Sequence, residues 1–191
     1  MAALHDYEAV SIYPIDDAVR EELLATHNEC VFNWSTQDGW PMGVIMSYLW
    51  REGRFWLTAG AHRHRITAVR RDPRVSVVVT STGTKLGAGK SLTAKGRCTV
   101  HEGRDVKDWF YPAFAGQLNP TSPEAAERFR AMLDSPLRVV LEVVPKKWIS
   151  YDGRKMFLDA AGKLPEAAKS APKSSDTVRL ARELERRGLV E

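Results

Sequence analysis

Hydrophobic side chains recur at two spacings along the chain, one typical of helices and the other of strands. Residues 15–27 have apolar positions at helical spacing and acidic residues near their start, which favours an N-terminal helix. Three runs rich in β-forming residues follow at 29–35, 41–50 and 54–59, and the turn-forming sequences QDG and REGR separate them. This part of the chain predicts an antiparallel meander.

One short helix and three further strands continue the pattern. The sequence HRITAVRRDP predicts a helix that ends at Asp72, because a residue before proline disfavours helical dihedral angles. The runs 74–81, 91–103 and 137–153 read as strands. Alternate apolar residues are expected to share one face in the first and last of these: Val75, Val77, Val79, Val139, Leu141 and Val143. Six antiparallel strands with few helices predict a mainly β fold, a small barrel with peripheral helices.

Two helices are expected before the closing strand, at 104–118 and 122–134. The second has Ser122 as its N-cap and Pro123 at its first helical position, both favoured there. Its apolar face is expected to contain Phe129, Met132 and Leu133.

The pattern suggests a barrel domain over 1–159, with these helices as an insertion at about 105–133. From Ala160 the chain is rich in Ala, Lys, Ser and Pro, which is typical of a mobile linker. The segment 160–191 is therefore read as a linker and a C-terminal amphipathic helix. The candidate contacts of that helix are Val178, Leu180, Leu184 and Leu189.

Composition places the chain among ordinary globular proteins. It has 191 residues with 43% hydrophobic and 27% charged, enough for one domain with a substantial core. Its N-terminus does not resemble a signal peptide, no apolar run is long enough to span a membrane, and the two cysteines suggest no disulfide framework. These features lead us to expect a cytoplasmic protein. A net charge of +4 favours a mildly basic surface over nucleic-acid binding as the main role.

The stretch GTKLGAGKS at 83–91 looks like a phosphate-binding P-loop. The motif G-x-x-x-x-G-K-[ST] would need a glycine at position 84, where the chain has Thr84. A P-loop also leads into a helix, whereas the following LTAKGRCTV has the pattern of a strand. We therefore expect a glycine-rich connection between two strands.

A second basic stretch, HRHR, is a better candidate for an anion site. It places His62, Arg63, His64 and Arg65 at the start of the short helix, where the helix dipole already disfavours cations. A bound anion would make this arrangement favourable, because the helix amides and the guanidinium groups would both face it. The alternative is a solvated basic turn. A metal site is disfavoured, since no other His, Cys or carboxylate has ligand spacing to this pair of histidines.

The run RFWLTAGAHRHRITAVRRDPRVSVVV resembles the pyridoxamine 5′-phosphate oxidase-like flavin-binding split barrels. That family has a strand ending in Thr, a basic step, a short helix, DPRV and then a strand. Its basic residue eight positions before the proline corresponds to Arg65, with His64 before it, and Thr58 and Ala59 end the preceding strand. A basic–polar pair before a glycine, here Lys90–Ser91 before Gly96, marks the next cofactor strand.

The resemblance implies a six-stranded antiparallel split barrel that forms a homodimer with two cofactor sites at its interface. It implies that Arg63, His64 and Arg65 hold the cofactor phosphate and that the strand 41–47 lies beneath the ring. Four residues would contact the ring or the ribityl chain: Thr58, Ala59, Lys90 and Ser91. Trp148 or Tyr151 would reach the neighbouring subunit's cofactor, although core or interface packing is the default reading of Trp148.

Two family features are missing. The oxidases carry an Arg and a Lys on the strand before the FWLT strand, where this chain has Pro41 and Met46, and the C-terminal WRLP-like signature is absent. The resemblance therefore favours a relative that uses FMN, or alternatively F420, for hydride transfer to or from a small conjugated substrate. Two other readings stay open: a non-catalytic flavin- or F420-binding protein, and a nucleic-acid-binding β-barrel.

Overall fold

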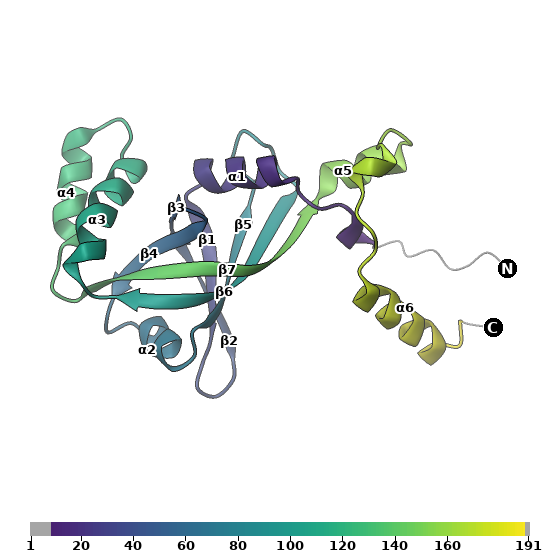
Figure 1. Ribbon diagram of the computed structural model, residues 1–191, viewed down its shortest axis with the longest axis horizontal. Coiled ribbons are helices and arrows are strands. Elements are labelled where there is room, and N and C mark those ends of the chain that lie inside the picture. Colours follow the sequence, from purple (N-terminus) through teal and green to yellow (C-terminus); the bar gives the residue numbers. More distant parts are fainter. Residues whose placement is uncertain (1–8, 190–191) are drawn as a thin grey trace.

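The computed structural model describes residues 9–189. The protein is mainly β, as expected, and all its strands pair antiparallel in one curled, half-barrel sheet (Figure 1). The sheet has seven strands in the order β2-β1-β5-β6-β7-β4-β3. Their bounds are β1 Glu29–Ser35, β2 Pro41–Ser47, β3 Leu49–Arg51, β4 Arg54–Gly60, β5 Arg74–Thr80, β6 Lys90–His101 and β7 Arg138–Asp152.

The seventh strand arises because the run expected at 41–50 divides at Tyr48. β2 pairs with β1 and β3 pairs with β4, so these two consecutive strands lie at opposite edges of the sheet. Only Tyr48 separates them, and its side chain is fully buried against Phe55, with ring centroids 5.2 Å apart. The two edges therefore come together at Tyr48, and the sheet curls on itself.

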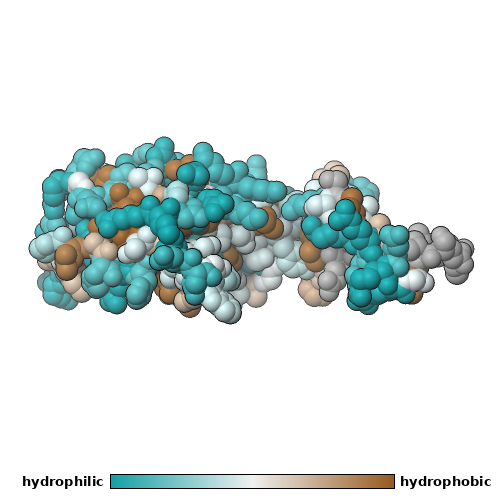
Figure 2. Space-filling view, turned by 90° about the horizontal axis from the view of Figure 1, so that it is seen from below, coloured by the Kyte–Doolittle hydropathy of each residue, from teal (hydrophilic) through white to brown (hydrophobic). Residues whose placement is uncertain are grey.

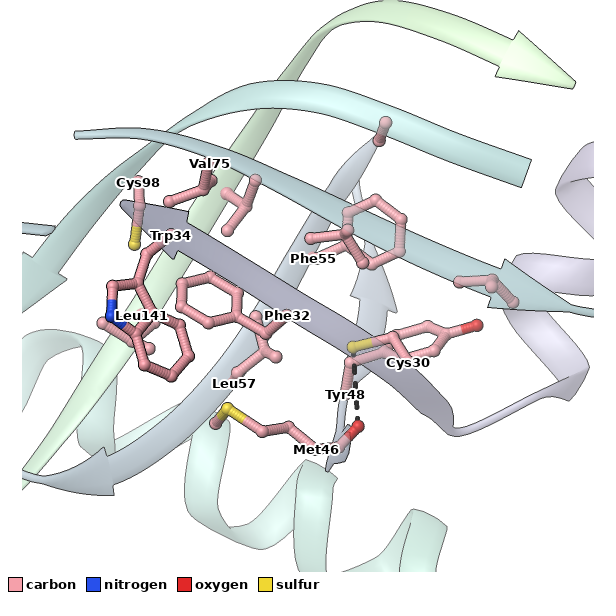
Figure 3. Close-up of a cluster of buried hydrophobic side chains, with 14 of the residues drawn as sticks. Cys30, Phe32, Trp34, Met46, Tyr48, Phe55, Leu57, Val75, Cys98 and Leu141 are labelled. Atoms are coloured by element: carbon pink, nitrogen blue, oxygen red, sulfur yellow. Dashed lines mark hydrogen bonds between the residues drawn. The ribbon is translucent and has the colours of Figure 1, made fainter. Parts of the chain in front are cut away.

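The curled sheet encloses the main core (Figure 3). Alternate residues of each strand point inward, for example Cys30, Phe32 and Trp34 of β1. The six alternating residues expected on β5 and β7 are all buried in this core: Val75, Val77, Val79, Val139, Leu141 and Val143. The alternation in the sequence was therefore a correct guide to the inner face.

A second core lies on the outer side of β4 and β7, under α3 (Arg104–Leu118) and α4 (Pro123–Leu133). Trp56 and Val140 of the sheet pack there with Phe110, Phe114 and Leu133. As predicted, Ser122 caps α4, and its Oγ accepts a hydrogen bond from the Ala125 amide at 3.2 Å. The expectation for Met132 was wrong: this residue is 56% exposed, at the rim of a small hollow that Phe114 and Leu118 of α3 also line.

Two helices of the N-terminal half lie on opposite sides of the strands, α1 (Asp17–Thr26) and α2 (His64–Arg71) (Figure 1). Leu23 and Leu24 of α1 are fully buried, and so is Ile66 of α2. Helix α2 ends before Asp72, as the following proline predicts. No helix within residues 9–189 combines the length and apolar character that crossing a membrane requires.

The C-terminal tail leaves the barrel after β7 (Figures 1 and 2). It contains α5 (Gly153–Ala160), which the sequence pattern did not predict, then η2 (Glu166–Ala168) and α6 (Ser174–Arg186). Hydrogen bonds tie its first part to the segment around the N-terminal turn η1 (Val10–Ile12), including Ser170 N to Ile12 O at 2.9 Å. On α6 and just after it, Val178 and Leu189 are about half exposed.

Candidate functional site at the start of helix α2

Helix α2 begins with an uncapped, positively charged turn. Arg63 occupies the N-cap with extended backbone angles, and no side chain caps the first turn. The first turn holds His64 and Arg65 and no acidic residue. Cations at a helix N-terminus oppose the helix dipole, so this turn is electrostatically unfavourable as it stands.

Arg65 is a partly buried cation in this turn. Its Nε atom is buried and has no hydrogen-bond partner among the described residues. Desolvation lowers the pKa of Arg65, and the nearby charges of Arg63 and Arg138 lower it further. A desolvated cation beside other cations is costly unless an anion neutralises it.

Two hollows meet at Arg65. The larger, which we call the α2 hollow, has a volume of about 540 Å³ and lies between α2 and the β1–β2 hairpin. Its walls are Trp34, Thr36, Gln37, Met42, Val44, Arg63, His64, Arg65, Thr67, Ala68 and Arg71. The smaller, of about 190 Å³, lies between β2, β4 and the α3–α4 pair and also contains Thr58 and Arg138. A pocket of the larger size is typical of small-molecule sites.

Four of the residues expected in the site come together here: Thr58, Arg63, His64 and Arg65. The Thr58 hydroxyl donates a hydrogen bond to the Val139 carbonyl at 2.8 Å, which fixes its side chain beside the smaller hollow. Ala59 is only 1% exposed, because its side chain points into the main core. Its backbone is buried as well, in the pairing of β4 with Val139 of β7, and Ala59 lines neither hollow.

Lys90 and Ser91 lie far from this cluster within one chain. Along β7, Thr58 pairs with Val140 whereas Lys90 pairs with Asp152. These pairing positions are about 12 residues, or roughly 40 Å of extended strand, apart. The Lys90 side chain is buried near Asp152, with Nζ 3.5 Å from Oδ1, while Ser91 is exposed on the outer face.

Trp148 also belongs to the distant end of β7. Its ring lies 6.1 Å from both Trp50 and Phe55, and the Arg20 guanidinium lies over it at 5.3 Å. The side chain packs against the main core. This arrangement agrees with the packing role that was the default reading of Trp148.

The segment that looks like a P-loop joins the antiparallel strands β5 and β6. The backbone φ angles of Gly83, Gly87 and Gly89 are 84°, 72° and 93°, values that residues other than glycine rarely adopt. The Ser81 hydroxyl accepts a hydrogen bond from the Lys90 amide at 3.1 Å and closes the connection. No helix follows, so the expectation of a glycine-rich connection is confirmed.

Arg138 is a member of the site that the sequence did not reveal. It is the first residue of β7 and pairs with Gly60, the last residue of β4. No local pattern marks it, because only the long-range pairing of β4 with β7 brings it to Arg65. Met42 and Val44 belong to the strand 41–47 that the resemblance places beneath the ring, whereas Trp34 of β1 was not expected in the site.

The described residues offer little other chemistry. Burial raises the pKa of the thiols of Cys30 and Cys98 to about 12, so neither is a reactive nucleophile at neutral pH. Within residues 9–189, no three His, Cys, Asp or Glu side chains gather as a metal site. The start of α2 is therefore the candidate site.

A family model described as pyridoxamine 5′-phosphate oxidase matches residues 15–152. The chain belongs to this family. The match spans every strand of the split barrel and ends at the last residue of β7, so α5 and α6 lie outside it. No curated protein matches the chain.

Solved structures share the fold at low sequence identity. A conserved hypothetical protein from Mycobacterium tuberculosis is 20% identical with a TM-score of 0.66, over 78% of this chain and 91% of that chain. An FAD-binding protein from Mesorhizobium loti is 18% identical with a TM-score of 0.54, over 73% and 96%. A structure named F420 reductase is 18% identical with a TM-score of 0.52, over 68% and 94%. These likenesses show the fold of the split barrel.

Proposed function

We propose that this split barrel is a flavin-dependent oxidoreductase that holds the phosphate of its cofactor at the start of α2. The observation that carries the proposal is the buried, unpartnered Nε of Arg65 beside Arg63 and Arg138. A phosphate would accept hydrogen bonds from the guanidinium groups and from the first amides of α2. It would also supply the missing negative charge.

The lining of the α2 hollow also supports the proposal, because it suits the ring of such a cofactor. Trp34, Met42 and Val44 give it an apolar wall next to the cationic turn. A ligand with an anionic end and a flat, largely apolar ring matches that combination. In this role the chain's residues bind the phosphate, orient the ring and exclude water from one of its faces.

FMN is the cofactor we propose, with F420 as the alternative. A bound flavin or deazaflavin supplies hydride transfer to or from a small conjugated substrate, so no side-chain nucleophile is required. The family membership and the fold shared with proteins named as FAD-binding and F420 reductase support a cofactor of this type. On β2, Pro41 and Met46 stand where the oxidases carry cations, which argues against oxidation of vitamin B6 itself.

We further propose a homodimer in the cytoplasm. Because Lys90 and Ser91 lie far along β7 from Arg65, one chain alone does not bring together all the cofactor contacts that the family pattern implies. A second copy that presents its Ser91 to the first chain's α2 hollow would complete the site. Both cysteines are free thiols, which suits a reducing compartment.

Mass spectrometry of the small molecule released by denaturation tests the proposal. We expect FMN, or F420 when the host makes it, at close to one per chain. Reduced cofactor that is reoxidised by conjugated acceptors would then separate an enzyme from a non-catalytic binder. Protein that carries no such molecule, and shows no fluorescence change on titration with FMN or F420, would falsify the proposal. Salt-sensitive oligonucleotide binding in its place would favour the nucleic-acid reading.

A further inference from the structure

A third hollow lies on the outer face of the sheet, on the other side of the β1–β2 hairpin from the α2 hollow. Its volume is about 670 Å³, and β1, β5, β6 and β7 all contribute to it. Its lining is Asn33, Trp34, Ser35, Pro41, Asp72, Arg74, Val75, Ser76, Lys95, Gly96, Arg97 and Lys146. We call it the bulge hollow, because β6 and β7 change register at Lys95 and Gly96.

Cations gather around the bulge hollow without matching carboxylates. The only acidic residue in its lining is Asp72, which is bound to Arg74 at 2.6 Å between Oδ2 and Nη2. Lys95, Arg97 and Lys146 are exposed and form no ion pair with any residue in 9–189. Three cations in one hollow therefore lack a counter-charge.

The strand register makes this arrangement unfavourable for the protein alone. Arg74 of β5 lies directly opposite Arg97 of β6, and Lys95 of β6 lies directly opposite Lys147 of β7. Like charges directly opposite each other destabilise a sheet. Asp72 offsets the charge of Arg74, so Lys95 opposite Lys147 is the pair that has no ion-pair partner among the described residues.

The bulge itself fixes the position of these cations. In the paired register Lys95 faces Lys147 and Gly96 faces Pro145, so Lys146 is the extra residue of β7. A side chain at Gly96 would place its Cβ 2.6 Å from the Val144 carbonyl oxygen, so the close backbone approach requires glycine. Bulges are frequent next to functional sites, where they redirect a side chain.

We propose that the bulge hollow binds a compact polyanion, a small molecule that carries two or more phosphate or carboxylate groups. Arg97 presents a guanidinium fork and the two lysines present ammonium groups, both suited to such anions. The volume of the hollow fits a small molecule. The bound anion would neutralise Lys95, Arg97 and Lys146, which have no ion-pair partner among the described residues.

The lining favours a small polyanion over a nucleic acid. Sites for single strands combine an extended basic groove with exposed aromatic rings on which bases stack. Trp34 is the aromatic residue of this lining, and it is only 7% exposed. Trp34 lines both this hollow and the α2 hollow, but Arg63, His64 and Arg65 line only the latter, so the two sites use different cations.

Binding of tripolyphosphate to the full-length protein tests the proposal. The hollow variant Lys95→Thr/Arg97→Thr removes two unpaired cations and keeps residues that favour strands. The control variant Lys85→Thr/Lys163→Thr removes two exposed cations, likewise unpaired among the described residues, elsewhere on the surface. Calorimetric titration should show tripolyphosphate binding that weakens about tenfold or more in the hollow variant and stays unchanged in the control.

Thermal unfolding gives a second readout, in which the variant that binds tripolyphosphate more weakly should be more stable than the wild type when no ligand is present. Without ligand at low ionic strength, the hollow variant should melt above the wild type, since it loses the repulsion between Lys95 and Lys147 and the unpaired charge of Arg97. Tripolyphosphate should raise the melting temperature of the wild type more than sodium chloride of the same ionic strength does. For the hollow variant, the two salts should raise the melting temperature equally. A merely structural role of Lys95 and Arg97 would lower the melting temperature instead.

Three outcomes would overturn the proposal. The first is equal tripolyphosphate binding by the wild type, hollow and control proteins, which would indicate non-specific attraction. The second is no stabilisation beyond that of sodium chloride. The third is tighter binding of a single-stranded oligonucleotide than of tripolyphosphate at the same phosphate concentration. Repeating the titrations with Arg65→Gln in every protein removes the α2 site, and the difference between hollow and control variants should persist.

Discussion

Arg65 loses water on folding without gaining a counter-charge from the described residues. The change Arg65→Gln should therefore weaken the affinity for FMN by about tenfold or more, because a charge-assisted contact to phosphate is lost. The free energy of unfolding of the cofactor-free protein should stay the same or rise by up to about 1 kcal/mol, since an unpaired buried group is removed. Fluorescence titration and denaturant unfolding measure the two effects.

Arg70 on the same helix is the matched control. Its guanidinium is half exposed and bonds Glu102 across the surface, away from both hollows at Arg65. Arg70→Gln should leave FMN affinity unchanged and cost at most about 1 kcal/mol of stability, as surface ion pairs do. Equal losses of affinity in both variants would indicate a general effect of charge and contradict the assignment of Arg65.

The cationic turn was visible in the sequence because HRHR and the following DPRV are local patterns. Its partner Arg138 was not visible, because 72 residues lie between it and Arg65 in the printed sequence. Only the pairing of Gly60 with Arg138 joins them. A local pattern of residues can thus suggest an anion site. The residue that completes the site, Arg138, is identified only by the register in which β4 and β7 pair.

The α3–α4 pair is a structural element with its own core on the outer face of β4 and β7. Phe110 is fully buried there, so Phe110→Ala should lower the free energy of unfolding by about 3–4 kcal/mol. Met132→Ala, on the exposed side of α4, should change it by less than about 0.5 kcal/mol. Urea unfolding of both variants measures the difference; similar losses would mean that Met132 is buried.

At the level of elements, alternation and turn signals predicted most strands and both inserted helices. They could not show that 41–50 divides at Tyr48, because its apolar run continues through the division. The division depends on the two sheet edges meeting, which is a tertiary event. Helix α5 was missed because Asp152–Gly153 reads as the turn that ends a strand, whereas Asp152 in fact caps the helix through the Arg154 amide.

On the scale of the whole molecule, the family pattern groups all the predicted cofactor contacts in the same site. In the single chain, these residues lie at two ends of β7. Thr58, Arg63, His64 and Arg65 lie at one end, and Lys90, Ser91 and Trp148 lie toward the other. The proposed homodimer, in which each site would take Arg65 from one chain and Ser91 from the other, would reconcile the two observations. Strand order in one chain cannot reveal such an arrangement.

Heterodimers with defined variants test whether the site crosses between chains. Ser91 is exposed, so Ser91→Tyr should block cofactor binding without disturbing the core. A heterodimer of one Arg65→Gln chain and one Ser91→Tyr chain, purified through two tags, should keep about half of the wild-type cofactor sites, because one site receives both intact residues. Pairing a wild-type chain with an Arg65→Gln/Ser91→Tyr chain should leave none, because each site then receives one altered residue. The opposite result, no sites in the first heterodimer and half in the second, would place the whole site within one chain.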